Sequence, residues 1–333
     1  MNKPFLILTL AVSAAIGLAQ NSAGYKFSAK IKLPGEGKWD YTSVDNNRSR
    51  LYVSHGDRVH VIDLNANKAI AEWTGLENVH GITFSALENK VYISNTGLNN
   101  VVIYNANTLE KITTVELPGG KKPDCILFDE YSQKVFVFCG KSNNVFVIDA
   151  KTDQLLTTIA LGGQPEFACT DEKGLIYNNL EDKNEVVVID SKNNQLIKRF
   201  SLLENKAPTG IAIDKVNGRI FVACEESRKM AVLSASTGKV ISTAPMGEKT
   251  DGLIYEQEMH LVVTSNGAGS ATVIRQETPD SYTVIQTLKT QPGLKTISCE
   301  RKTHRIFMTG ADLQADGKTI VAGSFGVYIY DLN

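Results

Sequence analysis

The sequence contains almost no segment that would cross a membrane. Its one long apolar run extends from Pro4 to Ala19, follows Lys3, and has the small residues Gly17 and Ala19 at the two positions that a signal peptidase reads. No later stretch approaches the roughly 20 apolar residues that a transmembrane helix requires. We therefore predict a signal peptide over residues 1–19 rather than an uncleaved anchor. The mature chain, residues 20–333, is expected to be periplasmic or secreted, with no membrane span.

An excess of charge of one sign is also missing. The chain has 35 Lys and Arg against 36 Asp and Glu, a formal net charge of -1, and the two signs are interspersed. Because binding to nucleic acid relies on clustered Lys and Arg, a nucleic-acid partner is not favoured.

Several signatures of enzymes and disulfide-rich proteins are absent. The sequence contains no His-Glu-x-x-His, Cys-x-x-Cys or Gly-x-Ser-x-Gly motif. There are five cysteines: three fall inside apolar strand patterns, and the other two lie at predicted strand ends in non-adjacent repeats. We expect mostly reduced core thiols rather than a disulfide framework.

What the chain does contain is a repeat. Seven similar segments begin at Asp40, His80, Asp124, Glu166, Thr209, Asp251 and Lys295, with spacings of 40, 44, 42, 43, 42 and 44 residues. A period of about 43 residues matches one blade of a β-propeller and is too long for a leucine-rich repeat. The repeat predicts an all-β fold, a seven-bladed β-propeller that forms a single domain over residues 20–333.

Within each repeat, short apolar or alternating runs are separated by turn residues, which predicts four antiparallel strands per blade. In the third repeat the expected strands are Cys125 to Phe128, Lys134 to Phe138, Asn144 to Asp149 and Leu155 to Ile159. The third strands of four repeats end in Asp or Asn, and we interpret these residues as turn formers rather than catalytic groups.

The seventh repeat runs out of sequence after three strands, the third being Phe325 to Asp331. The segment from Tyr25 to Leu33 is a candidate for the missing fourth strand, because apolar residues alternate there with Lys and Ser, giving one apolar and one charged face. We predict that this N-terminal strand joins the last blade and closes the ring, which would also protect the blade edges.

The repeats resemble those of the YVTN family of β-propellers, and residues 25–333 are similar to its periplasmic YncE-like members. The residues that carry the resemblance are Arg50-Leu51-Tyr52-Val53-Ser54, Lys90-Val91-Tyr92-Ile93-Ser94-Asn95, Arg219-Ile220-Phe221-Val222-Ala223, Val145-Phe146-Val147-Ile148-Asp149 and Val186-Val187-Val188-Ile189-Asp190. Propellers of this type serve as binding scaffolds, lactone hydrolases and oxidoreductase subunits, so the resemblance implies a fold without selecting a function.

The repeat geometry predicts where a site lies. In a propeller, the connection that enters each inner strand lies on the same face as the loop between the second and third strands. Two rings of residues should therefore converge at one mouth of the central channel. The first ring contains the seven residues that begin the repeats. The second ring includes His55, Asn95, Cys139, Asn179, Cys224 and Asn266.

Every residue of the first ring is polar, and four are carboxylates. Like charges in a partly desolvated site repel one another, and Lys295 offsets only part of this repulsion. We therefore expect a cation, or a basic or hydroxylated ligand, to be held by Asp40, Asp124, Glu166 and Asp251. The alternative is that these side chains solvate a water-filled channel and cap the inner strands.

Histidine placement adds a metal hypothesis. Of five histidines, only His55 and His80 are predicted at this mouth, in neighbouring blades. Together with Asp124 or Asp40 they form a candidate set of ligands for a divalent metal such as zinc or copper. No other cofactor is indicated.

Two features near the mouth have alternative interpretations. The Gly-rich insertion after Gly310 is either a mobile lid or, as we prefer, an ordinary long hairpin. Trp39 and Tyr41 either stack on a ligand or, as we prefer, fill space between blades.

Two classes of function follow. The first is an exported, monomeric binding or interaction module that takes a small molecule or a protein at the channel mouth. The second is a metal-dependent small-molecule enzyme, such as a lactonase-type hydrolase, or an accessory subunit of a redox system. We favour the module, because the sequence offers candidate ligands without an identifiable reacting group.

Overall fold

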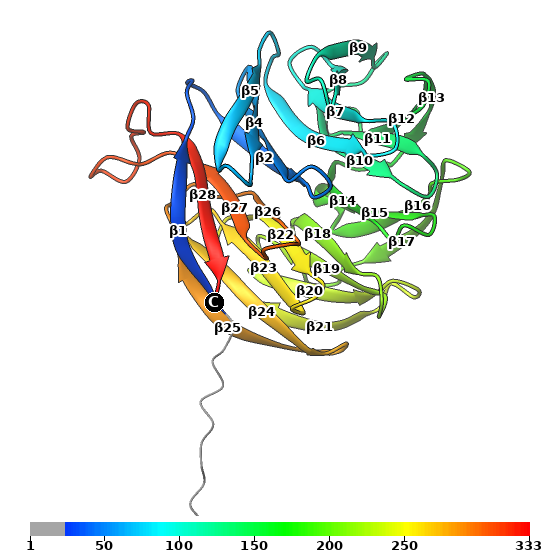
Figure 1. The fold of residues 1–333 in the computed structure, drawn as a ribbon. Helices are drawn as coiled ribbons and strands as arrows, with labels where there is room; N and C mark the ends of the chain where they lie inside the picture. Colours follow the sequence, from blue (N-terminus) through cyan, green and yellow to red (C-terminus); the bar gives the residue numbers. More distant parts are fainter. Residues whose placement is uncertain (1–23) are drawn as a thin grey trace, which may run out of the picture.

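The computed structural model describes residues 24–333, which form seven four-stranded antiparallel sheets arranged in a ring around a central axis (Figure 1). The prediction of a seven-bladed β-propeller is therefore confirmed. The predicted signal peptide, residues 1–19, lies outside the described residues. No helix in the described part of the chain is long and apolar enough to cross a membrane.

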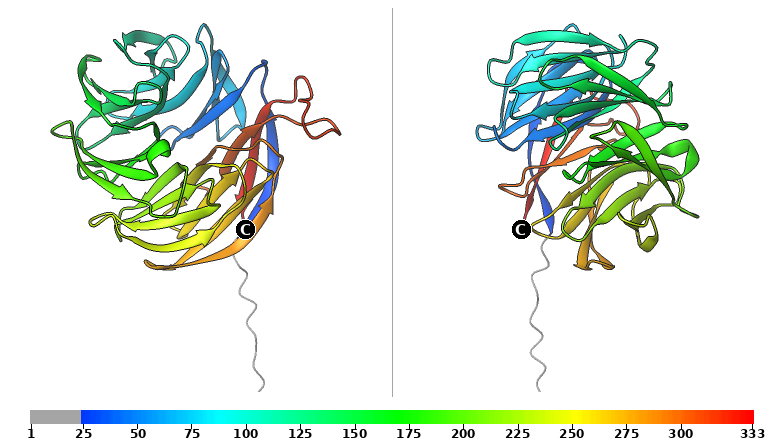
Figure 2. Two further views of the ribbon diagram at one scale, coloured as in Figure 1. Left: turned by 180° about the vertical axis from the view of Figure 1, so that it is seen from behind. Right: turned by 90° about the vertical axis from the view of Figure 1, so that its right-hand side faces the viewer.

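Each blade is a meander that runs from the channel to the rim of the ring (Figure 2). The inner strands are β2 (Trp39–Asp45), β6 (Val79–Ser85), β10 (Pro123–Asp129), β14 (Pro165–Thr170), β18 (Pro208–Asp214), β22 (Thr250–Glu256) and β26 (Ile297–Cys299). The second strands are β3 (Arg50–His55), β7 (Lys90–Asn95), β11 (Lys134–Cys139), β15 (Leu175–Leu180), β19 (Arg219–Cys224), β23 (Leu261–Asn266) and β27 (Ile306–Gly310).

The third strands are β4 (Arg58–Asp63), β8 (Asn100–Asn105), β12 (Asn144–Asp149), β16 (Glu185–Asp190), β20 (Lys229–Ser234), β24 (Ser270–Thr278) and β28 (Gly326–Leu332). The outer strands are β5 (Lys68–Trp73), β9 (Lys111–Glu116), β13 (Leu155–Ala160), β17 (Gln195–Ser201), β21 (Val240–Pro245), β25 (Ser281–Lys289) and β1 (Tyr25–Lys32).

The hydrophobic core lies between the blades. The second and third strands are buried on both faces, so they consist of continuous apolar runs instead of alternating ones. One cluster, for example, joins Tyr92 and Val101 of the second blade to Phe128 and Val137 of the third. The outer strands alternate mainly between half-buried and exposed residues because only one of their faces is covered. The five cysteines are free thiols, as expected.

Glycines let the inner strands approach closely around the narrow channel. A Cβ atom placed on Gly81 would lie 2.5 Å from the carbonyl oxygen of Asp124, and one on Gly210 would lie 2.6 Å from the backbone nitrogen of Leu253. Because both obstacles are backbone atoms of the neighbouring blade, no larger residue fits at either position.

Cationic side chains clamp most blades to the next one around the ring. The donors are the Arg or Lys residues that begin four of the second strands, and the Arg that directly precedes a fifth: Arg50, Lys90, Lys134, Arg219 and Arg305. Each reaches the turn after the third strand of the following blade. Lys90, for example, donates to the carbonyl oxygen of Ala150 (2.9 Å) and pairs with Asp153 (2.8 Å).

The ring closes where β1 pairs with β28, the third strand of the last blade, so both ends of the described chain lie in one sheet (Figure 1). The prediction of ring closure by the N-terminal strand is consistent with this pairing. Gln286 of the sixth blade also holds the start of β1, because its amide accepts from the backbone nitrogen of Tyr25 and donates to its oxygen, both at 2.8 Å.

The prediction that β1 has one apolar and one charged face is only partly correct. The register with β28 shifts between Phe27 and Ala29, which reverses the alternation of the two faces along the strand. Tyr25 is buried, but the Phe27 side chain is 51% exposed. Beyond the shift, Lys30 points inward and pairs with Asp312 of the β27–β28 connection at 2.8 Å.

That connection is the predicted insertion after Gly310. It projects from the rim of the ring beside β1 and β28 (Figures 1 and 2). A single antiparallel bridge between Leu313 and Ile320 gives it the form of a hairpin.

The contact of Arg305 between the last and the first blade allows a test of how much ring closure contributes to stability. Arg305 of the last blade donates to the carbonyl oxygen of Leu64 in the first blade (3.0 Å) and pairs with the buried Glu300 (2.8 Å). We expect Arg305→Met to lower the free energy of unfolding by about 2 kcal/mol, because it leaves the Glu300 carboxylate buried without its cation. Urea denaturation followed by circular dichroism measures the loss.

Lys198→Met is the matched control, since its ammonium makes one exposed 3.3 Å bond to the carbonyl oxygen of Ser236 between the fourth and fifth blades. This variant should lose less than about 0.5 kcal/mol. Equal losses in the two variants would show that the closure point has no special weight.

Candidate functional site

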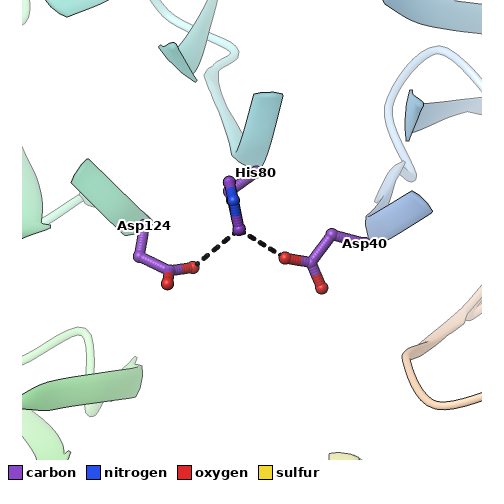
Figure 3. Close-up of side chains that lie close together, drawn as sticks. All are labelled: Asp40, His80 and Asp124. Carbon is purple, nitrogen blue, oxygen red and sulfur yellow. Dashed lines mark ion pairs between the residues drawn. The ribbon is translucent and has the colours of Figure 1, made fainter. Parts of the chain in front are cut away.

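Three side chains from consecutive blades meet at one mouth of the channel (Figure 3). His80 Nδ1 lies 2.5 Å from Asp40 Oδ2 and 3.3 Å from Asp124 Oδ1. His80 therefore bridges the two carboxylates. His80 Nε2 lies 3.1 Å from the amide nitrogen of Asn78.

The ion pairs continue on both sides of this triad. On one side, Lys122 Nζ lies 2.9 Å from Asp124 Oδ2. On the other, Lys295 Nζ lies 3.4 Å from Asp40 Oδ1 and 3.0 Å from Asp251 Oδ2.

These contacts form a continuous chain of alternating charge across five blades, which we call the mouth arc. In spatial order its members are Lys122, Asp124, His80, Asp40, Lys295 and Asp251. With three acids and three bases, the mouth arc is electrically balanced when every member is ionised. The carboxylates that the sequence places together are thus neutralised largely by the protein itself.

Hydrogen bonds between blades fix the backbone under the mouth arc. The Ser94 hydroxyl donates to the carbonyl oxygen of Asp124 at 2.6 Å, and the Ser265 hydroxyl donates to that of Lys295 at 2.6 Å. The Thr296 hydroxyl likewise donates to the carbonyl oxygen of Asp40. Each acceptor belongs to the blade that follows the donor, so blade packing sets the positions of the charged side chains.

The local shape of the inner strands also directs these residues to the mouth. In six of the seven inner strands, the pairing with the second strand shifts near the residue that begins the repeat. An irregularity of this kind turns a strand and redirects its side chains. Lys122 and Lys249 each lie two positions before the first residue of a repeat. Both have a φ of 57°, in the left-handed region, so the chain turns sharply there before it enters the inner strand.

The environment shifts the pKa values of this group in opposite directions. Burial alone would lower the pKa of His80, but the carboxylates of Asp124 and Asp40 outweigh it and raise the value to about 9. Burial alone would raise the pKa of Asp124, but His80 and Lys122 outweigh it and lower the value. His80 is therefore an imidazolium at neutral pH, and Asp124 is a carboxylate.

The remaining acids are harder to ionise. Burial raises the pKa of Asp251, and the nearby Asp40 raises it further, against the opposing effect of Lys295. Burial, followed by the charges of Asp124 and Glu181, raises the pKa of Glu166 to about 8. Glu166 is therefore largely protonated at pH 7 and adds a neutral hydrogen-bonding group beside the mouth arc.

Three of the predicted residues have other contacts. Thr209 is buried, and its hydroxyl donates to the carbonyl oxygen of Thr250 at 3.0 Å. Asn95 is buried, and its oxygen accepts from the backbone nitrogen of Glu77 at 2.7 Å. Both side chains therefore hold backbone near the mouth.

The third of these residues is His55, which the structure does not bring to His80. The His55 ring is buried and stacks on Phe325 with a centroid distance of 3.7 Å, and its Nδ1 lies 3.3 Å from His60 Nε2. Burial lowers the pKa of both histidines to about 4, so the pair is neutral at pH 7. Among the described residues, the ligand atoms that lie close enough for one metal ion come from Asp40, His80 and Asp124, without His55.

Sequence reasoning missed Lys122. It considered only the first position of each repeat, whereas Lys122 lies two residues earlier, directly before Pro123. The adjacent basic residues Lys121 and Lys122 were the available signal. Whether either one reaches the mouth depends on the turn into β10, which the repeat pattern does not specify.

An aromatic pair lies just inside the mouth. Tyr41 of the first blade stacks on Phe167 of the fourth, with ring centroids 4.6 Å apart. These blades are not neighbours, so the two rings meet across the channel and obstruct it. Trp39 packs on Phe325, and its indole donates to the carbonyl oxygen of Gly293 at 3.2 Å. Trp39 and Tyr41 therefore fill space within the protein.

Comparison with known proteins supports the fold alone. No protein-family model matches the chain, and no curated protein matches its sequence. The resemblance to the YVTN family and its YncE-like members therefore stays a prediction.

Several solved structures share the propeller architecture at low sequence identity. A chain of Kuenenia stuttgartiensis hydrazine synthase is similar with a TM-score of 0.73 and 12% identity, over 91% of this chain and 98% of that one. A chain of the mitotic checkpoint complex is similar with a TM-score of 0.75 and 12% identity, over 99% of both chains. The RRP9 WD40 repeats are similar with a TM-score of 0.77 and 10% identity, over 93% of this chain and all of that one.

The raised pKa of Glu166 gives a test of the electrostatics at the mouth. The folded-state pKa of about 8 lies above the ordinary 4.5, so ionising Glu166 costs stability as the pH rises between these values. Glu166→Gln removes that cost. The variant should gain up to about 5 kcal/mol over the wild type near pH 9 and nothing near pH 4, because the two pKa values differ by about 3.5 and each pKa unit corresponds to about 1.4 kcal/mol.

Urea denaturation at both pH values measures the difference in the free energy of unfolding. Glu110→Gln, at an exposed position on the rim of the second blade, is the control and should show no such dependence. A difference between Glu166→Gln and the wild type that does not change with pH would contradict the burial of an acid at this mouth.

Proposed function

We propose that this chain is an exported interaction module that uses the mouth arc to bind a polar ligand. The ligand carries groups of both charges or several hydroxyl groups, and it is either a free small molecule or part of a protein partner. The observation that carries the proposal is the alternation of acids and bases across five blades.

The balance of charge favours this ligand class over a simple cation. An isolated cation would be repelled by Lys122, His80 and Lys295, whereas a zwitterion can satisfy both signs at once. The Lys295 side chain is 42% exposed and that of Lys122 is 32% exposed, so both ammonium groups can reach a ligand from solvent. Asp40 and Asp251 flank Lys295 in the mouth arc, where they can accept from an ammonium or hydroxyl group.

The fold supports an interaction role in general terms. Propellers serve many functions, and two of the similar structures are a WD40-repeat protein and a chain of a multiprotein complex. Export is proposed from the charged and apolar pattern of residues 1–19. We propose that the exported protein is a monomer.

The proposal can be tested by ligand screening. The unfolding midpoint of the mature protein is measured at pH 7 with amino acids, betaines, sugars and short peptides of mixed charge, and hits are titrated by calorimetry. Asp40→Asn should weaken a hit at least about tenfold, because it breaks the link between His80 and Lys295. Asp57→Asn, at an exposed loop position, is the control and should bind normally.

A ligand that binds Asp40→Asn as well as the wild type would place binding elsewhere. A screen without hits, together with no partner retained from the exported proteins of the source cell, would contradict the module.

A metal-dependent enzyme is the second candidate, because the ligand atoms of Asp40, His80 and Asp124 all lie within 4.8 Å of one another. A metal ion would have to displace the proton of His80, whose pKa is about 9. At pH 7 about one molecule in a hundred has a neutral His80, so the affinity for zinc should rise about tenfold per pH unit between pH 7 and pH 9.

Elemental analysis of protein prepared without chelator or affinity-tag metal tests this alternative directly. About one equivalent of metal in the wild type and little in the His80→Ala, Asp124→Ala double variant would favour the metalloenzyme. A wild type without metal at pH 7 and pH 9 would eliminate it.

A further inference from the structure

The opposite end of the channel differs from the mouth in its chemistry. A cavity of about 590 Å³ opens there, walled mainly by the inner strands of the third to seventh blades. This volume lies within the range of about 300–1,000 Å³ that is typical of small-molecule sites.

The wall of this cavity is set by the fourth position of each repeat. At that position five blades place Leu127, Cys169, Ala212, Ile254 and Ser298, and all five line the cavity. Four of them are half-buried although they belong to inner strands, as expected of side chains that face an open space. These five side chains form a largely apolar part of the wall with one hydroxyl group, that of Ser298. Thr170, Gln257 and Glu258 also line the cavity.

The Ser298 hydroxyl group has no partner. Ser298 is 92% buried from solvent, because its exposed fraction is 8%, and its Oγ makes no hydrogen bond within residues 24–333. The Oγ atom is also closed off from solvent, so a molecule in the cavity meets an apolar surface at this position.

Charge of both signs lies around the cavity: Lys215 and Arg301 are cationic, whereas the acidic Glu256 and Glu258 lie beside His304. Arg301 is exposed, and its guanidinium makes no ion pair or side-chain hydrogen bond with any residue from 24 to 333. Lys215 lies on the rim as well, although it pairs with Glu172. An acidic group would be costly to bury among the apolar side chains but could stay at the rim beside Arg301.

The two ends of the channel are separated. Leu127 and Ala168 line the cavity and pack in the same cluster as Tyr41 and Phe167, the aromatic pair that obstructs the channel inside the mouth. A change to the cavity wall should therefore leave the mouth arc intact.

We propose that this cavity is a second binding site, for a compact hydrophobic molecule that carries one acidic group. The aromatic or branched aliphatic body contacts Leu127, Ala212 and Ile254, and the acidic group stays at the rim with Arg301. The site does not depend on the function proposed for the mouth.

Two fluorescent probes test the proposal on the mature protein. 1-Anilinonaphthalene-8-sulfonate has an aromatic body and an acidic group, and N-phenyl-1-naphthylamine has the same body without the acid. Each is titrated with excitation in its own absorption band, so that added tryptophan does not contribute. The wild type should bind one equivalent of each probe.

The variants separate the two parts of the site. Ala212→Trp fills the cavity and should weaken both probes at least about tenfold, whereas Leu156→Trp, on the outer strand β13, should change neither more than about twofold. Arg301→Ala should weaken only the sulfonate probe, by about fivefold. Circular dichroism verifies that each variant is folded. If Ala212→Trp is unfolded, Ile254→Phe is used in its place.

The proposal is overturned if the wild type takes up neither probe, or if the folded cavity-filling variant binds both probes as the wild type does. If Arg301→Ala weakens the two probes equally or not at all, the assignment of an acidic group is wrong. Ligands of the mouth, titrated on Ala212→Trp, should bind as they do to the wild type, which keeps this test separate from that of the proposed function.

Discussion

Seven sheets can form one stable domain here only if the first and last blades meet, and the pairing of β1 with β28 makes this contact. Without β1, the last blade would have three strands and an exposed edge at β28. With β1 in place, Arg305 of the last blade donates to the first blade, just as Lys90 and Lys134 donate to the blades that follow their own. The closed ring then fixes how far each inner strand lies from the axis.

The charged mouth is a consequence of that closure. Asp40 and Lys295 are 255 positions apart in the sequence, yet ring closure makes their blades neighbours and brings their side chains to 3.4 Å. Crowded carboxylates would oppose such an arrangement if every blade contributed one. Alternation of acids with His80 and two lysines removes most of the repulsion, and protonation of Glu166 removes more. The mouth can therefore be polar and stable before any ligand arrives.

Much of the fold could be predicted because the repeat appears directly in the sequence. The period of about 43 residues, the strand patterns and the missing fourth strand of the last repeat together indicate a closed seven-bladed ring. Asp40, His80 and Asp124 could be placed at one mouth because they occupy the same position in consecutive repeats. Lys122 and His55 could not be placed in this way. The position of Lys122 depends on a left-handed turn, and that of His55 on packing against Phe325, which lies 270 residues away.

The same repeat also gives the channel two different ends. Asp124 and Leu127 are three residues apart in β10, so in a regular strand they would point to opposite faces. The irregular pairing between Pro123 and Ile126 breaks the alternation, and both side chains can then face the channel, one at the mouth and one in the cavity. Five other inner strands share this irregularity. Because Tyr41 and Phe167 fill the space between the two levels, the first and fourth positions of the repeat can vary independently, and one ring can present a polar surface at one end and an apolar cavity at the other.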